Sequence, residues 1–258
     1  MEPHPLAIVS AMHEELRALV PALVDAQQHT LAGRRFIVGR MHGHAVVLAL
    51  SGIGKVSAAT TATLLINEFN ARALVFTGVA GGLGAGVRVG DVVVARQLLQ
   101  HDMDASPLFP RYEVPLTGRA RFDADAGLSN ALATSALRCM ARAGELLGEA
   151  HMVDFGIDSP LVHEGLVVSG DRFVSTAAES RVLAEALPDA LAVEMEGAAL
   201  AQVCVDFHRP FAVLRTVSDR ADDSAHADFT RFMAEVASVY TRVIVQDWLH
   251  TNAARAVT

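Results

Sequence analysis

Ala192-Val193-Glu194-Met195-Glu196-Gly197-Ala198-Ala199 joins an apolar segment to an alanine-rich one. The residues up to Val193 favour a strand, and those from Ala198 onward have high helix propensity. Glu194 and Glu196 lie two positions apart, which in an extended chain puts both on one face, aimed at something polar. The simpler interpretation is a helix that begins with Glu in its first turn, where the helix dipole favours it. Other segments of the sequence are needed to distinguish between these two interpretations.

Three further segments also place polar residues where a predicted strand ends. Residues 8–16 predict a strand, a turn and an acidic helix start. Residues 48–57 predict a strand that runs through a glycine turn into a helix. Residues 211–219 predict an apolar strand that ends in charged and hydroxyl groups. Open α/β sheets build their active sites at such strand ends, so these segments indicate a site.

The whole chain alternates between short apolar strands and helices. This pattern predicts an α/β fold with a single domain, residues 1–258 with a core of about 6–249, in which a mixed, mostly parallel central β-sheet is flanked by helices. No linker, repeat or low-complexity tract divides it. The predicted strands are 6–11, 35–40, 45–51, 73–78, 91–99, 165–169, 191–194 and 211–218. The predicted helices are 14–23, 57–69, 125–147, 177–187, 196–207 and 228–249.

Charge and cysteine content narrow the class of protein. The formal net charge of -8 argues against a nucleic-acid surface and suits a small neutral or zwitterionic ligand. Cys139 and Cys204 form no CxxC motif, which predicts two buried thiols and suits a reducing cytosol. The first residues lack a basic region, and glycines, Arg88 and Asp91 interrupt the apolar stretch 74–95. We therefore expect a cytoplasmic protein without a membrane span.

Seven motifs in one order carry a specific resemblance. They are Ala11-Met12-His13-Glu14-Glu15, Ser51-Gly52-Ile53-Gly54-Lys55-Val56, Thr77-Gly78-Val79-Ala80-Gly81-Gly82, His101-Asp102-Met103-Asp104, Ser169-Gly170-Asp171-Arg172-Phe173, Val193-Glu194-Met195-Glu196 and Arg215-Thr216-Val217-Ser218-Asp219. From about residue 8 to 249 the chain resembles the 5′-methylthioadenosine/S-adenosylhomocysteine nucleosidases of the purine nucleoside phosphorylase superfamily. The resemblance implies a nucleoside phosphorylase-like fold, no cofactor, and hydrolysis of the N-ribosidic bond to adenine and a 5-thioribose product.

Such cleavage builds positive charge on the ribose while electrons move into the base. It therefore needs an acid for the base, a carboxylate that activates water, and a clamp for the ribose hydroxyls. The resemblance implies that Asp219 is the acid facing purine N7, with Ser218 orienting it, and that Glu15 activates water. Arg215 matches the residue that places the carboxylates on the water side. Without the other motifs, the simpler interpretations would be preferred: Asp219 as a helix cap, Glu15 as a solvated first-turn residue and Arg215 as an edge or ion-pair residue.

The substrate-binding residues are also carried over from the family. Glu196 matches the acceptor of hydrogen bonds from the ribose hydroxyls, with Met195 packing on the sugar and Glu194 in support. Phe173 matches the aromatic that stacks on adenine, although a lone Phe more often belongs to a core. The other matches are the base-edge backbone of Val174, and Met12 and Phe229 around the 5′-alkylthio group.

Two residues at the glycine turn 75–82 favour water over phosphate as the nucleophile. The hexameric phosphorylases of the superfamily hold phosphate with an arginine and a serine, where this chain has Phe76 and Val79. Glu15 would also repel a phosphate dianion. Many nucleosidases of the family carry a hydroxyl at the position of Val79, holding water or ribose. A phosphorylase and a futalosine-type nucleosidase using the same pocket are the alternatives within the superfamily.

Other functions fit the sequence less well. A dinucleotide site at residues 52–57 would need a third glycine where Ser57 stands and an acidic residue after strand 73–78. A nucleoside sensor would not need both Glu15 and Asp219. A metal site at residues 101–104 lacks a second ligand cluster in the sequence.

The long segment 101–122 predicts a lid or an interface element. By resemblance, the chain is a homodimer in which the neighbouring subunit's 101–122 loop, with apolar Leu108, Phe109 and Tyr112, closes the 5′ end of the pocket.

Overall fold

A computed structural model describes residues 4–221 and 229–253. Its strands are β1 (Leu6–Ser10), β2 (Val24–Leu31), β3 (Arg34–Met41), β4 (His44–Leu50), β5 (Ala73–Gly82), β6 (Val92–Gln100), β7 (Arg121–Asp123), β8 (Val162–Ser169), β9 (Ala190–Glu194) and β10 (Phe211–Asp219). Its helices are α1 (His13–Leu19), α2 (Lys55–Asn67), α3 (Ala126–Met140), α4 (Ala143–Leu147), α5 (Glu149–Asp154), α6 (Ala177–Ala186), α7 (Gly197–Asp206), α8 (Phe229–Phe232) and α9 (Ser238–Ala253). Short turns η1 (Val20–Ala22) and η2 (Met233–Ala237) extend α1 and join α8 to α9.

The strands form one mixed sheet of ten strands, in the order β10-β6-β8-β9-β5-β1-β4-β3-β2 with β7 on β6. The pairings around β1 and the long pairings β10–β5 and β6–β8 are parallel, whereas the β2–β3–β4 ribbon is antiparallel. β10 also pairs with β5, so β5, β10, β6, β8 and β9 pair in a closed ring. The ring brings the ends of β5, β9 and β10 together.

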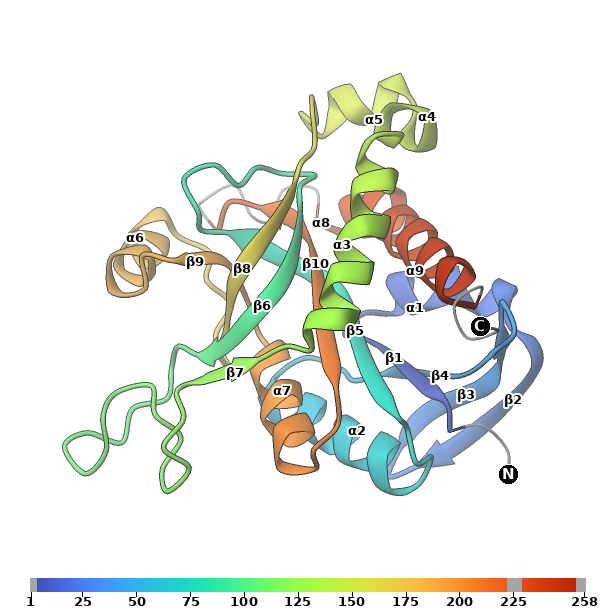
Figure 1. Ribbon diagram of the computed structural model, residues 1–258. Coiled ribbons are helices and arrows are strands. Elements are labelled where there is room, and N and C mark those ends of the chain that lie inside the picture. Colours follow the sequence, from blue (N-terminus) through green and yellow to red (C-terminus); the bar gives the residue numbers. More distant parts are fainter. Residues whose placement is uncertain (1–3, 222–228, 254–258) are drawn as a thin grey trace.

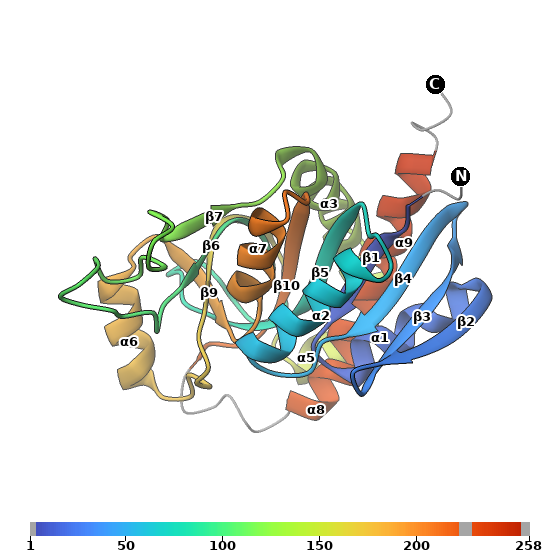
Figure 2. The same ribbon diagram turned by 90° about the horizontal axis from the view of Figure 1, so that it is seen from below.

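Helices cover both faces of the sheet (Figures 1 and 2). α2 and α7 pack on each other and on one face, over a core that includes Val9, Phe76 and Val213. α1, α3 and α9 cover the other face, over a core that includes Ile8, Leu214 and Trp248. β1 is buried along its whole length, as expected for a continuous apolar strand between two helical layers.

The structure adds elements that the hydrophobic pattern did not predict. β2 is exposed at nearly every position, so its sequence lacks the apolar alternation that marks a half-buried strand. The single predicted helix 125–147 is instead α3 and α4, because Arg142 leaves the helical conformation between them. α5 follows after Gly148, whose φ of 80° ends α4. The first residue of the predicted helix 228–249 lies outside the described residues.

Two further sequence expectations concern the thiols and the membrane. Cys139 and Cys204 are both buried and free, and burial raises the pKa of the Cys139 thiol to about 12. Within residues 4–221 and 229–253, no helix combines the length and apolar character needed to span a bilayer.

Candidate active site

A cavity of about 470 Å³ opens where β5, β9 and β10 end beside the start of α1. The residues to which the sequence gave a catalytic or substrate-binding role all line this one cavity: Met12, Glu15, Val79, Phe173, Val174, Glu194, Met195, Glu196, Arg215, Ser218, Asp219 and Phe229. They come from six separate stretches of the chain. Ile53 and Arg172 also line the cavity, although sequence reasoning gave neither of them a role.

Glu15 reaches the cavity because α1 begins directly after β1 and turns its first-turn carboxylate inward. The residue is fully buried, and neither carboxylate oxygen accepts a well-formed hydrogen bond from a described residue. Burial raises the pKa of Glu15 to about 7, although the charge of Arg215 and the nearby Met12 backbone oppose the rise. A buried carboxyl whose pKa lies near neutrality is suited to accepting a proton.

Arg215 is the largest fully buried side chain of the protein and lies beneath the cavity. Its guanidinium lies 4.1 Å from the centre of the Phe76 ring and donates to the Phe76 and Leu214 carbonyls. A Cβ on Gly78 would lie 2.9 Å from Arg215 Nη1, so glycine is required there. Phe76 is thus the surface on which Arg215 stacks.

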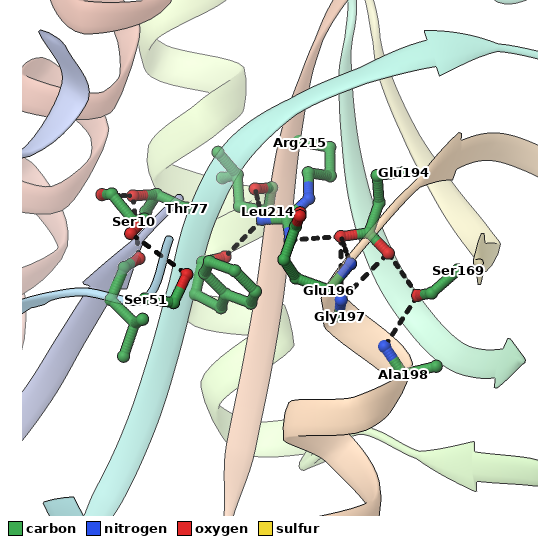
Figure 3. Close-up of polar contacts among 12 residues, drawn as sticks. Ser10, Ser51, Thr77, Ser169, Glu194, Glu196, Gly197, Ala198, Leu214 and Arg215 are labelled. Carbon is green, nitrogen blue, oxygen red and sulfur yellow. Dashed lines mark hydrogen bonds and ion pairs between the residues drawn. The ribbon is translucent and has the colours of Figure 1, made fainter. Parts of the chain in front are cut away.

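Glu194 binds Arg215 and the start of α7 at the same time, as Figure 3 shows. Its Oε2 accepts from Arg215 Nη2 at 2.6 Å and from the Glu196 N–H at 3.1 Å. Its Oε1 accepts from the Ser169 hydroxyl and from the Gly197 N–H at 2.9 Å. Because its oxygens are engaged by the protein, Glu194 positions other groups.

Glu196 lies two residues further along and has a different environment. Its Oε1 accepts the Gly54 N–H at 2.8 Å, which attaches the glycine turn to this wall of the cavity. Burial and the negative charge of Glu194 raise the pKa of Glu196, against the opposing effects of the Gly54 hydrogen bond and Arg215. Both Glu194 and Glu196 line the cavity, but the hydrogen bonds of Glu194 make it a positioning group.

A lysine missed at the sequence level connects three of the motifs. Lys55 Nζ donates to Asp102 Oδ1 at 2.7 Å and to Gln100 Oε1 at 3.1 Å. The Lys55 N–H donates to Asp171 Oδ1 at 2.7 Å, and the Asp171 N–H donates to Asp102 Oδ2 at 2.9 Å. The turn that holds Gly54 and the loop that carries Phe173 are thus joined to one another. The sequence signal that could have revealed this role is the lysine within the Ser-Gly-Ile-Gly-Lys-Val motif.

The His101–Asp104 motif contributes Asp102 to this network. The paired Lys55 ammonium and the Asp171 N–H hold the pKa of Asp102 below its usual range, although partial burial opposes them. Among the described residues, no group of three or more His, Cys, Asp or Glu side chains could hold a metal ion.

Asp219 closes the opposite wall of the cavity at the end of β10. Its Oδ2 accepts the Ser218 hydroxyl and its Oδ1 accepts the Ala221 N–H, both at 2.7 Å. A Cβ on Gly81 would lie 2.9 Å from Asp219 Oδ1, so the glycine of β5 makes room for this carboxyl. Two donors and a close backbone fix the direction of the side chain.

Apolar side chains form the rest of the lining. Phe173 is 43% exposed and Ile53 is 58% exposed, so both stand at the mouth of the cavity. Met12, Val79 and Phe229 pack partly against the core beneath α1 and α9. The cavity therefore joins a polar floor of carboxylates to an apolar rim, which is typical of sites for small organic ligands.

This fold and this cavity are those of the phosphorylase superfamily, and the family model of that description matches residues 5–246. A 5′-methylthioadenosine/S-adenosylhomocysteine nucleosidase of Shewanella frigidimarina is 35% identical over 242 residues, covering 93% of this chain and 96% of the relative. The same-named protein of Anoxybacillus flavithermus is 35% identical over 241 residues, with the same coverage of each chain. The chain belongs to the 5′-methylthioadenosine/S-adenosylhomocysteine nucleosidase family.

Solved structures agree with this assignment. The nucleosidase of that name from Neisseria meningitidis, in complex with methylthio-immucillin-A, superposes with a TM-score of 0.83 at 33% identity, covering 96% of this chain and 100% of that one. The S-adenosylhomocysteine nucleosidase of Streptococcus pyogenes, in complex with 5-methylthiotubericidin, gives a TM-score of 0.82 at 31% identity, covering 97% and 98%. The predicted mixed α/β fold is confirmed.

Proposed function

We propose that this protein hydrolyses the N-ribosidic bond of 5′-methylthioadenosine and S-adenosylhomocysteine and releases adenine. The observation that carries the proposal is the fully buried Glu15 carboxyl, whose oxygens accept no well-formed hydrogen bond from a described residue, in one cavity with Asp219. One group is suited to taking a proton from water and the other to giving a proton to the base. The relatives act on nucleosides of this type by name, which supports the substrate class.

In the proposed reaction, Asp219 transfers a proton to N7 of adenine while the bond from N9 to the ribose breaks. Glu15 accepts a proton from the water whose oxygen bonds to C1′. The carboxylate of Glu196 accepts hydrogen bonds from the ribose hydroxyls, while Glu194 and Arg215 hold that wall in place. Phe173 stacks on the base beside the Val174 backbone, Met195 packs on the sugar, and Met12 with Phe229 surrounds the thioether.

The charges around the cavity support water as the nucleophile. A phosphate dianion needs cations that can form charge-assisted hydrogen bonds. Among the described lining residues, both arginines have carboxylate partners, Arg215 with Glu194 and Arg172 with Glu179. Val79 offers no hydroxyl, and ionised Glu15 would repel the dianion.

Product analysis with and without phosphate tests the reaction. We expect purified protein to release adenine from methylthioadenosine at the same rate in phosphate-free buffer and in phosphate buffer, with free methylthioribose as the second product. Formation of a ribose 1-phosphate, or a strict need for phosphate, would overturn the hydrolase assignment.

We also propose a homodimer in which the partner's 101–122 loop covers the apolar mouth of the cavity. Ile53 at the mouth is 58% exposed and Val56 of α2 is 77% exposed, while Leu108 and Leu116 of the loop are 83% and 91% exposed. Apolar side chains are therefore available for such a contact both at the mouth and on the loop. Light scattering at assay concentration should give twice the mass of the chain. A fully active monomer would refute this arrangement.

A cytoplasmic location and a single domain of residues 1–258 belong to the same proposal. Two buried free thiols suit a reducing compartment, and one continuous sheet that includes β1 and β10 supports a single domain.

A further inference from the structure

A second, larger hollow lies on the outer side of α1. Its volume is about 990 Å³, and it is lined by one side of α1 and by β2, β3 and the end of β4. Figures 1 and 2 show α1 beside this antiparallel ribbon, at the end of the sheet away from α6. We call this hollow the α1 groove. Its lining is His13, Leu16, Arg17, Val20, Pro21, Gln28, Thr30, Gly33, Arg34, Arg35, Ile37, Leu50, Ser51 and Gly52.

The α1 groove is positively charged in a protein of net charge -8. Arg17, Arg34 and Arg35 line it, and no Asp or Glu does. None of these three arginines forms an ion pair with a carboxylate of residues 4–221 or 229–253. The arginines of the nucleoside cavity, by contrast, are both paired. Uncompensated like charges repel one another, so an anion in the groove would relieve that repulsion.

Part of this charge is already held in place. Arg34 is half-buried, and its Nε donates to Thr61 Oγ1 at 3.0 Å while its Nη1 donates to the Ala32 carbonyl at 3.1 Å. A guanidinium fixed in this way loses little conformational freedom when it binds, and its planar donors match phosphate oxygens. The groove also has an apolar part, formed by Leu16, Val20, Pro21, Ile37 and Leu50.

We propose that the α1 groove is a binding site for an organic polyphosphate of nucleotide size, separate from the nucleoside cavity. Three arginines match the charge of a di- or triphosphate, and the apolar part accommodates a ring. The volume is within the range of sites for ligands of that size. The groove borders the cavity, because His13 follows Met12 and Gly52 precedes Ile53 in the chain.

Calorimetric titration at fixed ionic strength tests the site directly. The probes are inorganic tripolyphosphate and uridine triphosphate, whose pyrimidine avoids confusion with adenine binding. We expect saturable binding of both probes, tighter for uridine triphosphate because only it reaches the apolar part. No saturable binding at millimolar probe, or equal affinity for the two probes, would overturn the proposal.

Paired variants identify the residues. Arg17→Ala/Arg35→Ala should weaken uridine triphosphate binding at least about tenfold, because two charge-assisted contacts are lost. The matched control Arg181→Ala/Arg242→Ala removes the same charge from exposed positions on α6 and α9 and should bind as wild type. An equal loss of uridine triphosphate affinity in both double variants would show that net charge alone causes the effect. That result would overturn the proposed site.

Competition separates the α1 groove from the nucleoside cavity. Saturating adenine, which is not turned over, should leave the protein able to bind uridine triphosphate. Displacement in proportion to the adenine concentration would place the probe in the nucleoside cavity and contradict the proposal. Because binding is measured without turnover, these results stand whether or not the hydrolase assignment holds.

Discussion

Glu15 and Glu194 are carboxylates on two walls of one cavity, yet they are held in opposite ways. Glu194 receives the Arg215 guanidinium, the Ser169 hydroxyl and backbone N–H groups. Glu15 is at least as deeply buried but accepts no well-formed hydrogen bond from a described residue. The comparison teaches that burial alone does not identify a reactive carboxylate. The hydrogen-bonded carboxylate, Glu194, supports the site. The carboxylate without such bonds from described residues, Glu15, is available for chemistry.

The largest effect should come from removing the proton-transfer groups. Glu15→Gln and Asp219→Asn each keep the shape of the side chain but cannot exchange the proton, so adenine release should fall roughly 10²–10⁴-fold. The KM for methylthioadenosine, measured in the same assay, should stay within a few-fold of wild type. Glu185→Gln, at an exposed position on α6, is the control and should retain full activity. Near-wild-type turnover in either variant would contradict the role proposed for the substituted residue.

The supporting wall should show its effect in stability. Glu194→Gln leaves the buried Arg215 charge without its counter-ion, which typically costs about 3–5 kcal/mol of unfolding free energy. Glu145→Gln breaks an exposed pair with Arg142, which water already screens, and should cost little stability. Urea denaturation of the two variants makes the comparison. Similar, small losses in both would contradict the distinction between the two walls.

A smaller effect should appear in the pH dependence of stability. The folded protein raises the pKa of Glu15 from 4.5 to about 7, so between these values it holds a proton that the unfolded chain has released. This stabilising contribution is present below pH 4.5 and is lost as the pH rises through about 7. It amounts to at most about 3 kcal/mol, and Glu196 acts in the same direction.

Urea denaturation of wild type and Glu15→Gln at pH 5 and pH 8 measures this contribution. Wild type should lose more stability than the variant between the two pH values, because all other groups titrate in both proteins. An identical pH dependence would mean that Glu15 is not the buried titrating group.

Sequence reasoning predicted much of the fold and the place of the site, because buried strands and motif spacing are local features. It grouped Glu194 with Glu196 around the ribose, and only the fold shows that Arg215 and Ser169 engage Glu194. Lys55 was missed because its partners lie 47 and 116 residues away in the chain. β2 was missed because an exposed edge strand carries no apolar alternation. The roles given to individual site residues remain predictions.

The Lys55 network joins three motifs that are distant in the sequence into one hydrogen-bonded unit. The turn at Gly54, the strand end at Asp102 and the loop at Asp171 share their hydrogen bonds. In a chimera that takes only one of these segments from a relative, the new segment would have to form the same hydrogen bonds with the two original ones. We therefore expect that exchanging all three segments together disturbs the site less than exchanging any one of them.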